Sequence, residues 1–192
     1  MAKSVLENNA VATADRQRSE PGEPPFNRKA DCVARILQRR ISPNLPKRIL
    51  VVGCGSGSEA AVLAQRLGSS VTGIDIEPAF DPTAMTWAEL RRGDATNLEF
   101  LDRSFDLVFS YHALEHIPQW ERALHEMKRM LTPGGWYCVG TPNRMRLIGY
   151  LGAENTSMRE KLLWNYNDWC ARLRGRFRNE FGAHAGFSEV EL

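Results

Sequence analysis

The sequence lacks any long run of apolar residues. Its longest runs, residues 49–54 and 105–109, fall far short of the roughly 20 consecutive apolar residues that a membrane-spanning helix needs. No apolar stretch follows Lys3, which predicts that the chain carries no secretory signal. We therefore expect a soluble protein.

Cysteine is scarce and scattered. The four cysteines contain no C-x-x-C pair and no spacing typical of a zinc site: Cys32, Cys54, Cys138 and Cys170. This pattern predicts reduced thiols in the cytoplasm, with neither a disulfide nor a structural zinc ion.

Net charge is also small, at +2. Nucleic-acid binding needs clustered Lys and Arg, so this excess alone does not predict it. The charge is unevenly distributed, however. Residues 144–178 contain eight Lys or Arg against three Asp or Glu, an excess of five positive charges.

What the sequence does contain is enough material for one α/β domain. A chain of 192 residues with 43% hydrophobic composition can bury an ordinary core but is too short for two large domains. Residues 1–27 are polar and proline-rich, which predicts a disordered lead-in. From Arg28, apolar residues recur at helical spacing as far as Ile41, and two X-Pro pairs then end the helix.

Strands and helices alternate along the rest of the core. The aliphatic strand 48–52 leads through Gly53, Gly55 and Gly57 into a helix, and a second strand follows at 70–75. Further elements are expected in this order: a short crossover helix within 76–89, a strand at 90–93, a strand at 105–110, a helix opened by Pro118 and ended by residues 132–135, and a strand at 136–140. This alternation predicts an α/β, Rossmann-like, doubly wound and mostly parallel sheet, with ligands at the carboxyl ends of its strands.

The glycine loop and Asp75 are the first candidate binding residues. Glycine allows a tight turn and close approach of backbone to a ligand, and the following helix presents free N–H groups. Asp75, at the end of the second strand, is a suitable acceptor for ribose hydroxyls. Two other interpretations remain open, a purely structural turn with Asp75 as a helix N-cap, and a nucleotide-dependent oxidoreductase, although Ser58 stands where the third glycine of G-x-G-x-x-G would be.

Five motifs in order connect the chain to a known family. VVGCGSG, VTGID, RRGDATNL, FDLVFSYHALEHI and LTPGGW together resemble the class I methyltransferases that use S-adenosylmethionine (SAM), especially the broad type 11 group that includes quinone-biosynthesis methyltransferases. The resemblance covers about residues 30–143. It implies that Gly53, Cys54, Gly55 and Gly57 line the methionine and ribose side of SAM, and that Asp75 accepts both ribose hydroxyls.

The same resemblance assigns the adenine and methionyl contacts. Ile76 would pack on the adenine, Asp94 would accept from its amino group, and Ala95 would donate its backbone N–H. Ser110 would lie beside the methionyl part. For Asp94 a solvated turn is the alternative interpretation.

One position departs from the family pattern. Family members usually have an acidic residue two positions before the first motif glycine, where it helps to hold the amino group of SAM, and this chain has Val51. Glu59 would compensate from the first turn of the next helix, or it would only favour the positive end of that helix.

His112 and His116 follow the fourth strand at the expected ligand edge. Free imidazole titrates near neutral pH, so either side chain could act as a general base toward a hydroxyl acceptor. A capping or packing role for His116 is the alternative. His112, Glu115, His116 and His184 also loosely resemble the metal-binding stretch of small-RNA 2′-O-methyltransferases, but His stands first instead of Glu, so no metal ion is predicted.

Residues 144–192 form the third expected region, a basic and aromatic segment. Insertions at this place usually cover the acceptor site in the family, and the segment could face an anionic substrate, a lipid surface or RNA. A solvated face over a lid helix packed by aromatic residues is the plainer interpretation. The family would continue beyond residue 192 through a helix and two strands, so we expect an incomplete C-terminal part of the sheet.

The domains are therefore predicted as 1–27 disordered, 28–143 SAM-binding core and 144–192 lid or substrate segment. The expected function is transfer of a methyl group from SAM to the oxygen, nitrogen or carbon of a small-molecule acceptor. A truncated or degenerate SAM-binding or partner domain is the first alternative, and an RNA methyltransferase is the second, because no nucleic-acid module appears.

Overall fold

The structure is a computed structural model. It describes residues 23–25, 27–77, 79–151, 153, 156–181, 185–188 and 190–191, so most of the predicted lead-in, including residues 1–22, lies outside it. The chain divides into two compact units. We call residues 1–111 and 119–139 the sheet unit, and residues 112–118 and 140–192 the helix unit.

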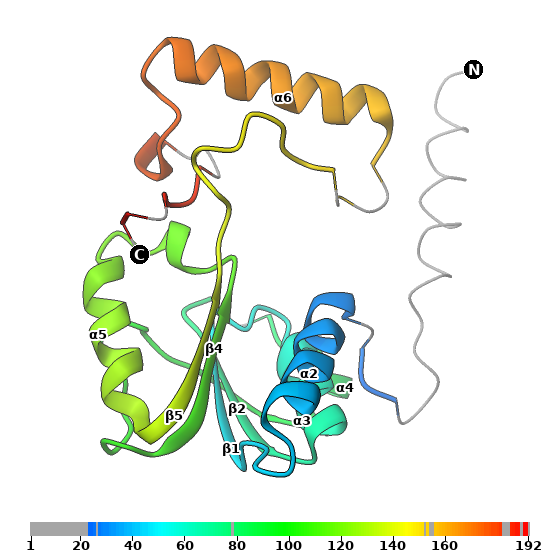
Figure 1. The fold of residues 1–192 in the computed structure, drawn as a ribbon, viewed down its shortest axis with the longest axis vertical. Helices are drawn as coiled ribbons and strands as arrows, with labels where there is room; N and C mark the ends of the chain where they lie inside the picture. Colours follow the sequence, from blue (N-terminus) through cyan, green and yellow to red (C-terminus); the bar gives the residue numbers. More distant parts are fainter. Residues whose placement is uncertain are drawn as a thin grey trace. The chain divides into compact units, whose positions relative to one another are not determined.

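The sheet unit is built on five strands in the order β3-β2-β1-β4-β5 (Figure 1). Their bounds are β1 Arg48–Val52, β2 Ser70–Asp75, β3 Glu89–Arg92, β4 Phe105–Tyr111 and β5 Leu131–Gly140. The sheet is parallel, and the strand order reverses direction between β1 and β4. The predicted Rossmann-like doubly wound fold is confirmed. Such a reversal is where open α/β sheets bind ligands.

The strand register gathers the motif residues at one edge. Val52, the last residue of β1, is paired with Ile74 on one side and with Ser110 on the other. Asp75 is paired with Arg92, the last residue of β3. The segments that follow β1, β2 and β3, and the end of β4, therefore share the carboxyl edge of the sheet.

Helices cover both faces of the sheet (Figure 1). Helices α2 (Arg28–Ile41), α3 (Ser58–Leu67) and α4 (Pro82–Met85) lie on one face, and α5 (Trp120–Met130) lies on the other. Apolar side chains fill the space beneath α2 and α3, and many of them are wholly inaccessible: Ala30, Ala34, Ile49, Val51, Ala60, Ala61, Leu63, Leu107 and Phe109. This burial on both faces explains the near-continuous aliphatic sequence of β1.

The element boundaries differ slightly from those expected. Strand β3 begins and ends one residue earlier, at Glu89 and Arg92. Helix α5 begins at Trp120, two residues after Pro118, because the intervening Gln119 serves as its N-cap. Strand β5 begins at Leu131, directly after α5, so the Pro-Gly-Gly turn lies within this strand and not before it. The short crossover helix is present as α4, with Asp81 accepting from the N–H groups of its first turn.

The helix unit contains the 3-10 turns Leu114–His116 and Asn179–Phe181 and the 16-residue helix α6, Met158–Leu173. A capping box begins α6. The Ser157 hydroxyl accepts from the Glu160 N–H, and the Glu160 carboxylate accepts from the Ser157 N–H. No helix in the described part of the chain is long and apolar enough to cross a membrane.

Candidate functional site

The glycine loop after β1 is held against β2 by backbone hydrogen bonds. The N–H groups of Gly53 and Cys54 both donate to the carbonyl of Ile74, at 2.9 and 3.0 Å. Gly53, Gly55 and Gly57 all have positive φ angles, of 73°, 52° and 88°. Because side chains disfavour this backbone region, the three glycines allow the sharp turn from strand to helix.

The surroundings of Gly55 and Gly57 differ. A Cβ added to Gly57 would lie 2.1 Å from a methyl carbon of Leu90, so this glycine is required by packing between the loop and β3. A Cβ added to Gly55 would meet no atom within 4 Å. Gly55 therefore borders open space, where a ligand could approach the backbone without displacing protein atoms.

Asp75 connects the glycine loop to the end of β2. Its Oδ2 accepts from the Gly55 N–H at 2.8 Å, and its Oδ1 accepts from the Glu77 N–H at 3.0 Å. A carboxylate offers about four lone-pair positions, so these two bonds leave capacity for two further donors. The N-cap role considered for Asp75 is not what the structure shows, because these two N–H groups belong to loops and not to a helix end.

Asp94 lies in the turn after β3. Its Oδ1 accepts from both the N–H and the hydroxyl of Thr96, each at 2.8 Å, and these bonds lower the pKa of Asp94. The side chain is exposed and borders a cavity of about 130 Å³ that Ile74, Gly93 and Asn97 also line. Ala95 follows in the same turn.

Two apolar positions complete the edge in different ways. Ile76, directly after Asp75, is 57% exposed, so its side chain is accessible to a flat aromatic ligand. Val51 is fully buried beneath α2 and α3. A carboxylate at position 51 would be surrounded by apolar side chains and would lose its hydration. The environment of Val51 therefore does not suit the acidic residue of the family pattern.

Ser110, the penultimate residue of β4, is wholly buried. Among the described residues its hydroxyl has no hydrogen-bond partner. A buried hydroxyl without a partner costs about 1–3 kcal/mol. A polar ligand group at the end of β4 would remove this cost.

These observations fit the cofactor that the resemblance implies. The open space at Gly55, the remaining acceptor capacity of Asp75 and the unsatisfied Ser110 hydroxyl all belong to the sheet unit and to its carboxyl edge. A ribose diol and a charged amino-acid part need hydrogen-bond acceptors, hydroxyls and backbone groups of this kind.

A hydrogen-bonded group of side chains lies at the start of the helix unit. The Nδ1 atom of His112 is 2.9 Å from Oε1 of Glu115, and the Thr141 hydroxyl donates to Oε2 of Glu115 at 3.2 Å. Burial raises the pKa of Glu115, but the hydrogen bond from His112 and the nearby histidine charges outweigh it and lower the pKa overall. His112 itself has a φ of 53°, so its backbone is held in the left-handed region.

Glu115 entered the sequence analysis only within the metal-binding alternative, not as a partner of a catalytic base, and Thr141 was not predicted at all. The short spacing of three residues between His112 and Glu115 could have indicated their contact, although His112 precedes the 3-10 turn Leu114–His116 and does not lie on it. Thr141 is 26 residues further along the chain, and no local pattern connects it to Glu115. His116 is exposed at the end of the same 3-10 turn.

The metal-binding alternative gains no ligand set from the structure. In the described ranges, no three His, Cys, Asp or Glu side chains are placed to hold a metal ion. His184, which that alternative would need, lies outside the described residues. All four cysteines are free.

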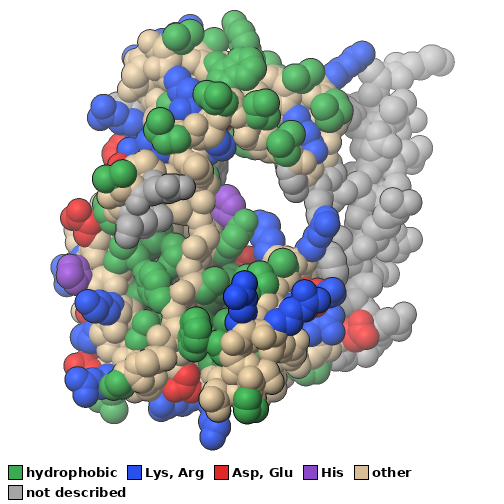
Figure 2. All heavy atoms as spheres, in the orientation of Figure 1, with side chains coloured by type: hydrophobic (Ala, Val, Ile, Leu, Met, Phe, Trp, Pro, Cys, Tyr) green, Lys and Arg blue, Asp and Glu red, His purple; other side chains and the backbone are tan. Residues whose placement is uncertain are grey.

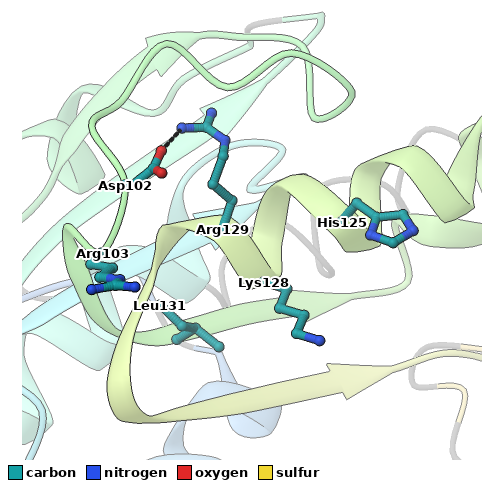
Figure 3. Close-up of a pocket in the computed structure, with 6 residues that line it drawn as sticks. All are labelled: Asp102, Arg103, His125, Lys128, Arg129 and Leu131. Carbon is teal, nitrogen blue, oxygen red and sulfur yellow. Dashed lines mark hydrogen bonds and ion pairs between the residues drawn. The ribbon is translucent and has the colours of Figure 1, made fainter.

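A second pocket, of about 390 Å³, lies beside α5 (Figure 3). It is lined by Asp102, Arg103, His125, Lys128, Arg129 and Leu131. Because it borders the loop that precedes β4, it is at the amino edge of the sheet and away from the glycine loop. Arg129 bonds to Asp102 at 2.6 Å and to Glu126, Leu98 and Phe100, so its guanidinium ties that loop to α5. The role of Arg129 is structural.

A parallel sheet of order 3-2-1-4-5, with a glycine loop after β1 and an acidic residue at the end of β2, is typical of Rossmann-like domains. Residues 50–139 match the family model described as "Methyltransferase domain", the type 11 methyltransferase family. This stretch, just under half of the chain, is therefore similar to type 11 methyltransferase domains.

Curated relatives are methyltransferases by name. A phthiotriol/phenolphthiotriol dimycocerosates methyltransferase of Mycobacterium leprae is 41% identical over 95 residues, which cover 46% of this chain and 35% of the relative. A methyltransferase of Streptomyces halstedii is 31% identical over 120 residues, covering 58% of this chain and 43% of the relative. The matched region thus spans less than half the length of these relatives.

Solved structures support the same fold. A protein of Bacillus halodurans described as a methyltransferase aligns with a TM-score of 0.55 and 18% identity, covering 82% of this chain and 64% of its own. A protein of Methanococcus maripaludis described as SAM-dependent aligns with a TM-score of 0.52 and 18% identity, covering 79% and 70%.

Proposed function

We propose that this chain transfers a methyl group from SAM to the oxygen, nitrogen or carbon of a small-molecule acceptor. The observation that carries the proposal is the pairing of Gly55 with Asp75, a hydrogen bond of 2.8 Å beside open space at the carboxyl edge of β1 and β2. The type 11 domain and the methyltransferase relatives support it.

Bound SAM would supply an electrophilic methyl group on a sulfonium, which asks the protein mainly for alignment. Asp75 would hold the ribose hydroxyls, and Gly53, Cys54, Gly55 and Gly57 would line the ribose and methionine side. Ile76, Asp94 and Ala95 would contact the adenine. The Ser110 hydroxyl would bind the methionyl part, which gives its buried oxygen a partner.

For an acceptor that must lose a proton, we propose His112 as the general base. Glu115 accepts from Nδ1 of His112, which fixes the imidazole tautomer and leaves Nε2 as the atom able to take a proton. Glu115 acts through His112 and is therefore a positioning residue, itself held by Thr141. In the sequence His112 directly follows Tyr111, the last residue of β4. His116 is the second candidate base.

The acceptor class and the cellular location are also proposals. Relatives named for phthiotriol and phenolphthiotriol support an acceptor that bears hydroxyl groups, for which a base is useful. The free thiols support a reducing compartment, the cytoplasm.

Calorimetric titration of the full chain with SAM, S-adenosylhomocysteine and NAD tests the cofactor assignment. We expect saturable binding of both sulfur ligands and none of NAD. Asp75→Ala should lower the affinity for both about 100-fold, because two hydrogen bonds to a charged acceptor contribute roughly 3 kcal/mol in total. Selective NAD binding, or no binding by a chain that circular dichroism shows to be folded, would overturn the proposal.

The base is tested by the pH dependence of methyl transfer once an acceptor is found. His112→Asn should lower kcat by about 100-fold or more, as removal of a general base typically does. Glu115→Gln should alter the pH profile and lower kcat, with little change in the affinity for SAM. A full rate in His112→Asn would exclude this base and leave His116 to be tested in the same way.

A further inference from the structure

Helix α6 carries an apolar stripe on its outer side. Five residues spaced at i, i+4, i+8, i+11 and i+15 form it: Met158, Leu162, Tyr166, Trp169 and Leu173. At 100° per residue they fall within an arc of about 80° and extend along roughly 22 Å of helix. All five are exposed, from 46% for Trp169 to 89% for Leu173. Figure 2 shows hydrophobic side chains gathered over α6, at the top of the view.

The bonded, polar side of α6 fixes this orientation, and it borders the stripe: at 100° per residue Asn165 and Asp168 lie about 20° and 80° outside its Met158 edge. The side chain of Asn165 accepts from the Gly149 N–H at 2.7 Å and donates to the Gly149 carbonyl at 3.2 Å. Asp168 pairs with Arg146 and also accepts from the Tyr150 hydroxyl. Rotating the stripe inward would break these bonds, so the apolar residues are a stable outer face of the helix unit.

Apolar residues of the preceding segment enlarge the exposed surface within the same unit. They are Met145, Leu147, Ile148 and Leu151, each at least 59% exposed. Scattered exposed apolar residues are ordinary, but a contiguous set along one helix marks an interaction surface. Trp169 remains tied to the segment through a 2.7 Å bond from its indole N–H to the Leu147 carbonyl.

Cations accompany the stripe. Arg159 and Arg174 are exposed on α6 and its C-cap, about 20° and 80° beyond the Tyr166 edge of the stripe at 100° per residue. Arg176 and Arg178 follow and are exposed as well. The acidic side chains of α6 are Glu160, which is bonded to Ser157, and Asp168, which is paired with Arg146, so the four arginines leave an excess of positive charge. Apolar residues that include Trp and Tyr, with arginines alongside, are typical of helices that lie in the surface of an anionic bilayer.

We propose that the outer face of α6 is a docking surface for an anionic lipid bilayer, with Leu162, Tyr166 and Leu173 entering the acyl boundary. The arginines at 159, 174, 176 and 178 contact lipid phosphates. The helix lies in the membrane plane and does not span it, in keeping with its polar inner face. This surface would bring the enzyme to apolar substrates, but its binding to lipid does not depend on the methyltransferase activity.

Flotation of the full chain with phospholipid vesicles tests the proposal. We expect the chain to float with vesicles that contain phosphatidylglycerol, and to float less with pure phosphatidylcholine or in high salt. Leu162→Glu/Leu173→Glu should weaken the partition at least tenfold, since two apolar side chains would no longer be buried. Leu101→Glu is the matched control, because Leu101 is also a strongly exposed leucine but belongs to the sheet unit.

The charge arm compares Arg174→Gln/Arg176→Gln with Arg39→Gln/Arg40→Gln, two exposed arginines of α2. Only the first pair should reduce binding to the anionic vesicles. Circular dichroism verifies that each variant is folded. The proposal is overturned if the folded wild-type chain floats with neither kind of vesicle. It is overturned as well if the control Leu101→Glu loses vesicle binding as strongly as Leu162→Glu/Leu173→Glu. It is also overturned if ultracentrifugation shows a dimer that Leu162→Glu/Leu173→Glu dissociates while vesicle binding is absent, since the occupant would then be a second copy.

Discussion

Helix α3 buries its apolar residues, whereas helix α6 exposes most of its own. In the sheet unit, α3 buries Ala60, Ala61, Val62, Leu63, Ala64 and Leu67. In the helix unit, the one buried residue of α6 is Asn165, and the leucines face outward. Both helices have caps and lengths that are ordinary for globular proteins. The difference teaches that apolar periodicity specifies the packed core in one unit and an interaction surface in the other.

Truncating one leucine in each helix gives the largest expected contrast. Leu63→Ala should lower the free energy of unfolding by about 3–5 kcal/mol, because the side chain is fully buried and leaves a cavity. Leu162→Ala should change it by less than about 0.5 kcal/mol, since Leu162 is 65% exposed. Urea denaturation followed by circular dichroism measures both. A cost of several kcal/mol for Leu162→Ala would mean that the α6 stripe is packed in solution.

Removing a charged partner from the bonded side of α6 should destabilise the helix unit, as truncation of a core side chain destabilises the sheet unit. Arg146 bonds to Asp168 and also lies over the Phe177 ring, 5.3 Å from its centroid. Arg146→Ala should destabilise the helix unit by about 2–3 kcal/mol, because Asp168 would lose the partner of a half-buried charge. Hydrogen exchange should then speed up in α6 and not in β1 or β4. Arg159→Ala, at an exposed position of the same helix, is the control and should leave exchange unchanged.

The glycines at 55 and 57 separate the requirements of packing from those of binding. Gly57→Ala should cost about 1–3 kcal/mol of stability, because the added Cβ overlaps Leu90. Gly55→Ala should cost only about 1 kcal/mol, for its positive φ, but should weaken SAM binding strongly. Thermal unfolding and calorimetry measure the two effects. Equal losses of affinity and stability in both variants would show that the open space at Gly55 is not the ligand side.

The sheet unit was largely predictable from the sequence. Aliphatic runs such as Ile49–Val52 and glycines at the strand end are local signals, and the alternation of strands with helices predicts that the strands pair in parallel. The start of β5 could not be predicted, because Pro133 and Gly134 indicate a turn while the backbone continues as a strand. Backbone hydrogen bonding decides such boundaries, and turn propensity is only a weak guide to it.

The helix unit was predictable only in part. A basic and aromatic segment was expected at residues 144–192, and α6 lies within it. Trp164 packs edge-on against Tyr150, whereas Tyr166 and Trp169 face outward. Two arginines of the expected patch, Arg146 and Arg172, instead pack on Phe177. The inward position of Arg146 depends on Asp168, 22 residues away, and the contact of Thr141 with Glu115 joins residues that are 26 apart.

The smallest expected effect concerns Glu115, which belongs to the helix unit but is as buried as a core residue of the sheet unit. Its pKa is lowered in the folded protein, so its stabilising contribution is fully present above the pKa of the unfolded state and is lost as the pH falls through the folded value. The free energy of unfolding of the wild type should therefore fall by about 1 kcal/mol more than that of Glu115→Gln between pH 7 and pH 3. Urea titrations at a series of pH values measure the difference. Parallel pH curves for the two proteins would mean that the bond between His112 and Glu115 adds no stability, and the positioning role of Glu115 would lose its physical basis.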